Sequence, residues 1–270
     1  MDLGLDGKAC AITGASRGIG REVAERLCAE GASVLLVARS ADKLAEAARE
    51  CGLVGGRAEP LALDVTEPDA GERILAAAAA SFGQLDVLVN NAGTSKRRPL
   101  DQVPDEDWEA AWQLNVMAPL RAMRAATPSM AERGWGRVVN VCSSAGKRPS
   151  GMTPEYSVTK AAELSLSRVF ADAYAKEGVL VNAICPGPTK SELWMEPGGL
   201  LDQSAQIGGG LSRDEALAAA GAGRPIGRLK VGVHAVALPD DNARGLRRIE
   251  QSGGYAQHRL ELADGPPSHP

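Results

Sequence analysis

The sequence predicts an α/β protein with one doubly wound parallel sheet and helices on both faces. Short apolar runs rich in β-branched residues alternate with alanine-rich helical stretches along most of the 270 residues. The apolar runs are continuous, as expected of parallel strands that are buried on both faces. Right-handed crossovers between such strands distribute the helices over both faces of the sheet.

Six runs in this rhythm are candidate strands, at residues 8–13, 33–38, 58–65, 85–92, 137–144 and 179–187. A helical stretch follows each of the first five, at residues 20–31, 41–52, 70–83, about 105–133 and 155–178. No linker interrupts the alternation, so we interpret residues 1–270 as a single domain.

The chain changes character after Pro186. Residues 188–224 are punctuated by glycine and carry several apolar side chains. A long stretch of this kind inside a compact domain is usually functional, and we interpret it as a lid over a substrate site. Residues 231–270 show no clean periodicity and form an atypical tail, so the sequence does not clearly predict a C-terminal strand.

Composition excludes several classes of function. Apolar residues make up 44% and charged residues 24%, as in an ordinary globular protein, and the net charge of −4 indicates no general affinity for nucleic acid or an anionic membrane. No apolar run is long enough to span a bilayer, and the N-terminus does not resemble a signal peptide. The five cysteines are scattered and the three histidines all follow residue 233, so we expect a cytoplasmic protein with free thiols and without a metal site.

A glycine-rich turn, TGASRGIG at residues 13–20, joins the first strand to the first helix. Gly14, Gly18 and Gly20 let the backbone turn tightly and approach a ligand closely. The helix that follows offers free N–H groups and the positive end of its dipole to a pyrophosphate. The spacing G-x-x-x-G-x-G differs from the commonest dinucleotide fingerprint, so a glycine-rich turn without a ligand is the alternative.

The end of the second strand bears on the choice of nucleotide. Ala38 and Arg39 stand about 20 residues after the turn, where NAD enzymes carry an acidic residue for the ribose 2′-hydroxyl. An arginine there suits a 2′-phosphate through charge-assisted hydrogen bonds, and Arg17 in the turn can reach the same group. The expected cofactor is therefore NADP(H), and the alternative is that both arginines are solvated surface charges.

Tyr156 and Lys160 lie four positions apart near the start of a predicted helix and therefore share a face. A phenol ordinarily titrates near pH ~10, and a neighbouring ammonium group stabilises its charged form. The pair predicts a proton donor and acceptor suited to neutral pH. Ser143 ends the fifth predicted strand, at the sheet edge where open α/β folds bind ligands.

Six motifs in order resemble the classical short-chain dehydrogenase/reductase family: TGASRGIG, NNAG at 90–93, Asn115 in LNVMAP, Ser143, Tyr156-x-x-x-Lys160 and Pro186-Gly187. The likeness spans about residues 5–230 and is closest in overall look to 3-oxoacyl-carrier-protein reductases. It implies a Rossmann-type fold, an NADP(H) cofactor, and one dinucleotide-binding and catalytic domain over the whole chain.

The resemblance also implies a role for each matching position. Tyr156 exchanges a proton with the substrate oxygen, Ser143 hydrogen-bonds that oxygen, and Lys160 holds the nicotinamide ribose. Asn115 helps hold a water in a proton relay. Ser144 is the alternative serine, but along a strand its side chain would point to the opposite face. The implied cofactor-binding residues are Gly14, Ser16, Arg17, Gly18, Ile19, Gly20, Arg39, Asp64, Val65, Asn91, Ala92, Gly93, Lys160, Pro186, Gly187 and Thr189.

Two classes of function follow. The first is an oxidoreductase that transfers a hydride between the nicotinamide and a carbonyl or secondary alcohol. The apolar lid favours an apolar substrate such as a 3-oxoacyl thioester, and a dehydrogenase of a steroid, sugar or polyol alcohol is the alternative. Gly134 and Glu177 argue against a carrier protein, because they stand where the similar reductases hold the acidic carrier with arginines.

The second class is a catalytically weak NADP-binding protein, which the aberrant tail favours. The tail is either strongly diverged or the product of a change of reading frame. Similar proteins use their C-terminus in subunit contacts, so a homo-oligomer, dimer or tetramer, is expected if this C-terminus permits it. A small-molecule substrate is expected, with neither a nucleic acid nor a membrane as partner.

Overall fold

The computed structural model describes residues 3–222 and 230–231. All of these residues belong to one compact unit, residues 1–233. The predicted tail, with the question of its C-terminal strand, lies outside the described residues apart from Val231.

A single sheet of six parallel strands forms the centre of the unit, in the order β3-β2-β1-β4-β5-β6. All six predicted strands are present, and the doubly wound Rossmann-type architecture is confirmed. All five connections between these strands run through helices. The strand order reverses between β1 and β4, the switch point where such sheets bind ligands. The strands are β1 (Ala9–Thr13), β2 (Ser33–Ala38), β3 (Arg57–Ala62), β4 (Val87–Asn90), β5 (Gly136–Val141) and β6 (Val179–Ile184).

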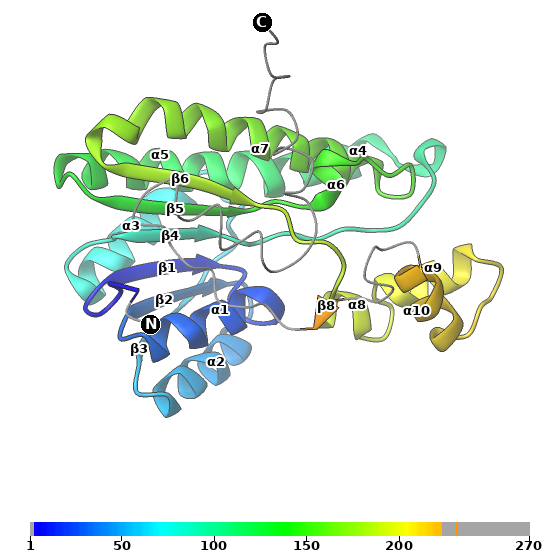
Figure 1. Ribbon diagram of the computed structural model, residues 1–270, viewed down its shortest axis with the longest axis horizontal. Helices are drawn as coiled ribbons and strands as arrows, with labels where there is room; N and C mark the ends of the chain where they lie inside the picture. Colours follow the sequence, from blue (N-terminus) through cyan, green and yellow to red (C-terminus); the bar gives the residue numbers. More distant parts are fainter. Residues whose placement is uncertain (1–2, 223–229, 232–270) are drawn as a thin grey trace, which may run out of the picture. The chain divides into compact units, whose positions relative to one another are not determined.

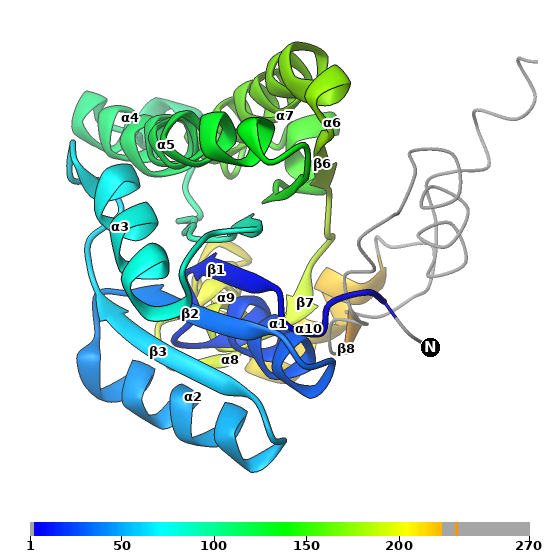
Figure 2. The same ribbon diagram turned by 90° about the vertical axis from the view of Figure 1, so that its left-hand side faces the viewer.

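Helices cover both faces of the sheet (Figures 1 and 2). One face carries α1 (Gly18–Ala29) and α2 (Ala41–Leu53), and the other carries α3 (Ala70–Phe82), α5 (Ala118–Glu132) and α7 (Pro154–Tyr174). The strands β1, β4 and β5 are buried along their full length, which explains their continuous apolar pattern.

Small residues allow the helices of the second face to pack closely. A Cβ atom on Gly71 of α3 would lie 2.5 Å from the carbonyl oxygen of Arg121 in α5, so only glycine fits there. Further along α3, Ile74 and Ala78 join Met123 of α5 in the main hydrophobic core. The small residues on the buried face of α3, Gly71 and Ala78, therefore serve this packing.

The strand β3 lies at one edge of the sheet and carries Pro60. Proline lacks the N–H that a central strand needs for its two ladders. The edge position of β3 is consistent with this residue.

The segment interpreted as a lid contains regular structure. It begins with β7 (Thr189–Lys190), which pairs with β8 (Lys230–Val231), and continues with α8 (Glu192–Met195), α9 (Leu200–Ile207) and α10 (Arg213–Ala222). Trp194 and Leu200 are buried in one small cluster of this segment and Leu201 in another. The apolar side chains of the segment thus pack on one another.

Candidate active site

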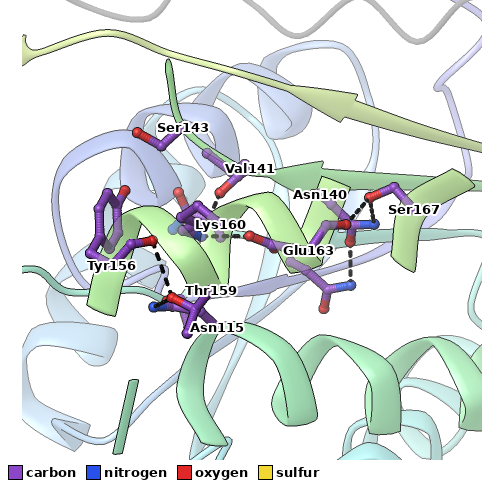
Figure 3. Close-up of polar contacts among 12 residues, drawn as sticks. Asn115, Asn140, Val141, Ser143, Tyr156, Thr159, Lys160, Glu163 and Ser167 are labelled. Atoms are coloured by element: carbon purple, nitrogen blue, oxygen red, sulfur yellow. Dashed lines mark hydrogen bonds and ion pairs between the residues drawn. The ribbon is translucent and has the colours of Figure 1, made fainter. Parts of the chain in front are cut away.

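The face of α7 that carries Tyr156 and Lys160 lies at the carboxyl ends of the central strands. Pro154 opens the helix, where its fixed φ and missing N–H are tolerated. Lys160 is 2% exposed, and its Nζ lies 5.8 Å from the centre of the Tyr156 ring. The structure therefore brings this predicted pair together (Figure 3).

The ammonium group of Lys160 is held from two sides. It donates to the carbonyl oxygen of Val141 at 2.9 Å and to Glu163 Oε2 at 2.7 Å. Burial, the largest single influence, lowers the pKa of Lys160, but Glu163 and Tyr156 together with smaller influences raise it above its ordinary value. Lys160 is therefore a charged group at neutral pH, in spite of its burial.

Ser143 lies two residues after the end of β5 and is the N-cap of the short helix α6 (Ser144–Lys147). Its Oγ accepts a hydrogen bond from the Ala145 N–H at 3.1 Å, which leaves the hydroxyl proton available for another acceptor. Figure 3 shows the Ser143 hydroxyl and the Tyr156 phenol turned to the same side of α7. The neighbouring Ser144 approaches Gly187 instead, where a Cβ would lie 3.9 Å from Ser144 Oγ.

Asn115 lies in a π-helical turn, η2 (Gln113–Met117), between α4 (Asp105–Trp112) and α5. Such turns often occur at functional sites because they redirect a side chain. Asn115 Nδ2 donates to Thr159 Oγ1 at 3.0 Å, and Thr159 in turn donates to the carbonyl oxygen of Glu155 at 2.9 Å. Sequence reasoning missed Thr159, although its position between Tyr156 and Lys160 on the helix could have identified it.

Two polar groups converge beside Gly93. Asn115 Oδ1 is buried and has no hydrogen-bond partner among the described residues. A Cβ built on Gly93 would lie 3.4 Å from this oxygen and 3.6 Å from Lys160 Nζ, which retains one of its three N–H donors. A ligand with hydroxyl groups, such as a ribose, would satisfy both atoms, so these residues fit the nucleotide predicted from the sequence.

The glycine-rich turn is braced by the strand next to it. Gly14 and Gly18 have φ values of +69° and +56°, the region that favours glycine. Asn91 Nδ2 donates to the carbonyl oxygens of Thr13 and Gly14 at 2.9 and 3.2 Å. A Cβ on Gly20 would lie 2.4 Å from that nitrogen, so the turn and the end of β4 fit each other only with glycine. Ser16 and Ile19 complete this turn, and Ala92 lies behind it.

Arg17 and Lys43, two cations, lie with Glu196 at the rim of the glycine-rich turn. Arg17 Nη1 donates to Glu196 Oε2 at 2.6 Å, and Lys43 Nζ lies 4.0 Å from Glu196 Oε1. The carboxylate of the lid thus sits between two cations from different βα units. Lys43 was not predicted from the sequence, although its place in the first turn of α2, four residues after Arg39, could have indicated it.

Arg39 and Asp64 follow the carboxyl ends of the neighbouring strands β2 and β3. Asp64 Oδ1 accepts hydrogen bonds from the N–H and hydroxyl of Thr66 at 2.9 and 2.7 Å. Burial opposes ionisation of Asp64, but these bonds and the charge of Arg39 hold its pKa below the ordinary value. Val65 is buried in the main hydrophobic core, so its side chain anchors the loop that follows β3.

The loop after β6 packs on the segment that holds Ser143. Ser144 N–H donates to the carbonyl oxygen of Pro186 at 3.0 Å. Thr189 Oγ1 donates to the carbonyl oxygen of Gly187 at 3.1 Å, which fixes the turn between them. The predicted residues of this loop therefore lie beside the segment that contains Ser143.

Residues 3–222 and 230–231 contain no group of three or more His, Cys, Asp or Glu side chains arranged to hold a metal ion. Within the same residues, no helix is long and apolar enough to cross a membrane.

Several known proteins are similar to this chain in sequence. A short chain dehydrogenase of Pseudocercospora fijiensis is 39% identical over 191 residues, which cover 70% of this chain and 62% of that protein. Galactitol 2-dehydrogenase of Agrobacterium fabrum is 34% identical, with 88% of each chain covered. The 3-oxoacyl-[acyl-carrier-protein] reductase of Escherichia coli is also 34% identical, with 71% of this chain and 77% of that protein covered.

Solved structures agree with the fold. L-sorbose reductase from Gluconobacter frateurii, complexed with NADPH and L-sorbose, superposes with a TM-score of 0.79 at 36% identity, covering 86% of this chain and 87% of that one. NAD⁺-bound xylitol dehydrogenase superposes with a TM-score of 0.75 at 26% identity, covering 84% and 88%. The short chain dehydrogenase model matches residues 8–198. This chain therefore belongs to the short-chain dehydrogenase family of oxidoreductases.

Proposed function

We propose that this protein is an NADP(H)-dependent enzyme that interconverts a ketone and a secondary alcohol. The observation that carries the proposal is the convergence of Tyr156, Ser143 and Lys160 at the carboxyl edge of the sheet, next to the glycine-rich turn. Proton donors directed to one region beside a nucleotide site suit a reaction that changes a C=O into a C–OH.

Each residue has a part in this reaction. Ser143 donates its free hydroxyl proton to the substrate oxygen and so orients it. Tyr156 delivers a proton to the same oxygen on reduction and takes it back on oxidation. Lys160 presents its remaining N–H to the ribose, and Asn115 Oδ1 accepts a hydrogen bond in the same space. The bound nicotinamide supplies the hydride.

The preference for NADP(H) rests on three cations. Arg17 and Lys43 surround a carboxylate, which indicates that an anion is stable at this position. Arg39 stands on the adjacent loop, where a 2′-phosphate would be recognised. The relatives are divided, because the sorbose reductase was solved with NADPH and the xylitol dehydrogenase with NAD⁺. The charges of this chain favour the former.

We propose a polyhydroxylated ketone or polyol as the substrate. Leu193 and Met195 of the lid are partly buried. The other side chains that favoured an apolar substrate, Trp194, Leu200 and Leu201, are buried among the helices of the lid. They are therefore not free to line a site for an acyl chain. Similarity to the galactitol dehydrogenase and the sorbose reductase over 86–88% of this chain supports a sugar-like substrate.

A 3-oxoacyl thioester is the second candidate, supported by similarity to the Escherichia coli reductase. One observation weighs against a carrier-bound substrate. Arg133 donates to the carbonyl oxygen of Leu85 at 2.6 Å and lies 3.8 Å from Asp86, so it is engaged within this chain. Gly134 beside it has a φ of +68°, which suits its glycine and disfavours an arginine.

The test is the oxidation of NADPH with a panel of keto-sugars, 3-oxoacyl thioesters, diketones and quinones. We expect turnover of a keto-sugar, with NADPH preferred to NADH. Turnover of only the thioesters would support the second candidate. If NADPH binds and no member of the panel is reduced, the protein is a catalytically silent NADP-binding protein and the proposal fails.

The surroundings of the enzyme are part of the same proposal. All five cysteines are free thiols and four are buried, which suits the cytoplasm.

Val158 and Val169 on α7 are 49% and 62% exposed, and they favour a homo-oligomer that covers this helix. Analytical ultracentrifugation of the purified protein tests whether it forms this homo-oligomer.

A further inference from the structure

The buried carboxylate of Glu163 has no role in the reaction described above. It follows Lys160 by three residues and Tyr156 by seven, so all three side chains share one face of α7. The side chains of Lys160 and Glu163 are 3% and 2% exposed. A carboxylate is rarely buried so completely unless its charge is needed.

The contacts of Glu163 connect the helix to the strand that carries Ser143. Its Oε2 accepts a hydrogen bond from the Lys160 ammonium group at 2.7 Å, and Cys142 is among the groups that influence the pKa of this carboxylate. Burial raises the pKa of Cys142, so this thiol keeps its proton. Because the same ammonium group donates to the carbonyl oxygen of Val141, Glu163 is linked through Lys160 to the end of β5.

Lys160 is therefore fixed at two of its three donors. The carbonyl oxygen of Val141 holds one N–H from β5, and Glu163 holds a second from within α7. The third is left for the space beside Gly93 and Asn115 Oδ1. Without Glu163, the ammonium group could turn about its flexible stem, and its last donor would lose a defined direction.

We propose that Glu163 is a positioning residue that anchors the Lys160 ammonium so that one N–H is directed to the cofactor ribose. This inference rests on the proposed function, because it gives Lys160 a ribose to bind. Glu163 itself touches neither substrate nor cofactor.

The charges of Lys160 and Glu163 predict the direction in which removal of Glu163 changes the pH dependence. The other titratable groups that act on it are Tyr156 on α7, Cys142 after β5 and Cys185 after β6. Burial lowers the pKa of Lys160, but Glu163 and Tyr156 together raise it above the ordinary value, so the ammonium group contributes to stability below the ordinary lysine pKa and this contribution is lost as pH rises through the raised pKa. Burial raises the pKa of Glu163, because the charge of Lys160 offsets only part of the cost of burying the carboxylate. In E163Q, burial acts with less opposition, so Lys160 should lose its proton at a lower pH.

The experiment is a titration of the full chain with NADPH, followed by cofactor fluorescence at a series of pH values from neutral to alkaline. In the wild type, the dissociation constant should stay flat into the alkaline range. In E163Q, binding should weaken at a pH lower by about 1–3 pH units, the usual effect of removing an opposite charge at this distance. The K160M/E163Q variant should bind NADPH weakly at every pH, and its dissociation constant should not rise further in the alkaline range.

Two further variants separate positioning from simple stabilisation. Asp86 is another buried carboxylate, which accepts from the Ala9 N–H at the opposite end of the sheet. D86N should unfold at a lower urea concentration and keep the pH profile of the wild type. E163D keeps the charge and withdraws the carboxylate by one methylene, so it should weaken NADPH binding by several-fold with a profile close to that of the wild type.

The outcomes are distinct. If the wild type binds NADPH and E163Q has the wild-type profile, this inference is overturned and the proposed function stands. If the wild type does not bind NADPH, the proposed function fails, and the inference that rests on it fails as well. Should E163Q fail to fold, E163D decides, because wild-type binding by E163D would show that the place of the carboxylate does not matter.

Discussion

The face of α7 and the rim of the glycine-rich turn are both charged, but they are built in different ways. On α7, the ion pair of Lys160 and Glu163 is almost fully buried, with side-chain exposures of 3% and 2%. At the rim, Arg17 and Glu196 are 43% and 41% exposed and contact each other across two segments far apart in sequence.

The difference decides how strongly each group responds to its surroundings. Water and salt screen exposed charges, over about 8–10 Å at ordinary ionic strength, whereas buried pairs are screened much less. Exposed ion pairs contribute about 0–1 kcal/mol. The α7 face is therefore suited to hold reacting groups in place, and the rim is suited to exchange one anion for another.

The largest effect should come from Tyr156→Phe on the buried side. The ring is kept and the proton donor is lost, so kcat for ketone reduction should fall by about 10²–10⁴-fold. NADPH binding, measured by fluorescence, should change little. Tyr174→Phe is the matched control, because Tyr174 stacks on Phe170 at the far end of the same helix. Retention of more than a tenth of the activity by Tyr156→Phe would refute the role of the phenol.

On the exposed side, Arg39→Ala should weaken NADPH binding by roughly 10- to 100-fold, since a hydrogen bond to a charged group contributes about 1.5–3 kcal/mol. NADH lacks the 2′-phosphate and should bind as before. Arg57→Ala, which changes an exposed arginine stacked on Phe82, is the control. Equal weakening of both cofactors would mean that Arg39 is only a surface charge.

Thr159→Val tests the buried network without removing a charge. The variant leaves Asn115 Nδ2 without its acceptor, which should cost about 1–3 kcal/mol of the free energy of unfolding. Because Asn115 then loses its fixed orientation, kcat should fall more than the affinity for NADPH. A urea titration and steady-state kinetics measure the two quantities, and an unchanged unfolding midpoint would contradict the link.

The smallest effect should come from Glu196→Gln. Removing this carboxylate frees Arg17 and Lys43, so NADPH should bind more tightly by up to about fivefold at low salt. High salt should erase the gain. Glu215→Gln is a control in the same segment, because Glu215 accepts from Ser212 at the start of α10. Tighter binding of NADH by the same factor would argue against competition for the 2′-phosphate.

The two regions also differ in how well the sequence predicts them. Tyr156, Lys160 and Ser143 follow from helical periodicity and strand order, and the structure places them together. Glu163 lies on the same periodic face, but a glutamate in a helix is ordinarily solvated, and only packing against β5 reveals its burial.

The rim and the lid were harder to predict, because they depend on contacts between distant segments. The pairing of Arg17 with Glu196 spans 179 positions, and no local pattern encodes it. In the lid, glycines punctuate the sequence, whereas the structure has short helices, with Trp194 and Leu200 buried in one cluster and Leu201 in another. Whether residues 188–224 close over a substrate remains our proposal, and hydrogen exchange with and without NADPH and substrate tests it.

The edge strand β3 has a consequence for the way copies of this protein can assemble. A strand that approached β3 would meet Pro60, which has no N–H to offer, and the alternating charges of Arg57 and Glu59. Continuation of the sheet on this side is therefore disfavoured. Growth of the sheet, whether by a later part of this chain or by another molecule, is directed to the side of β6.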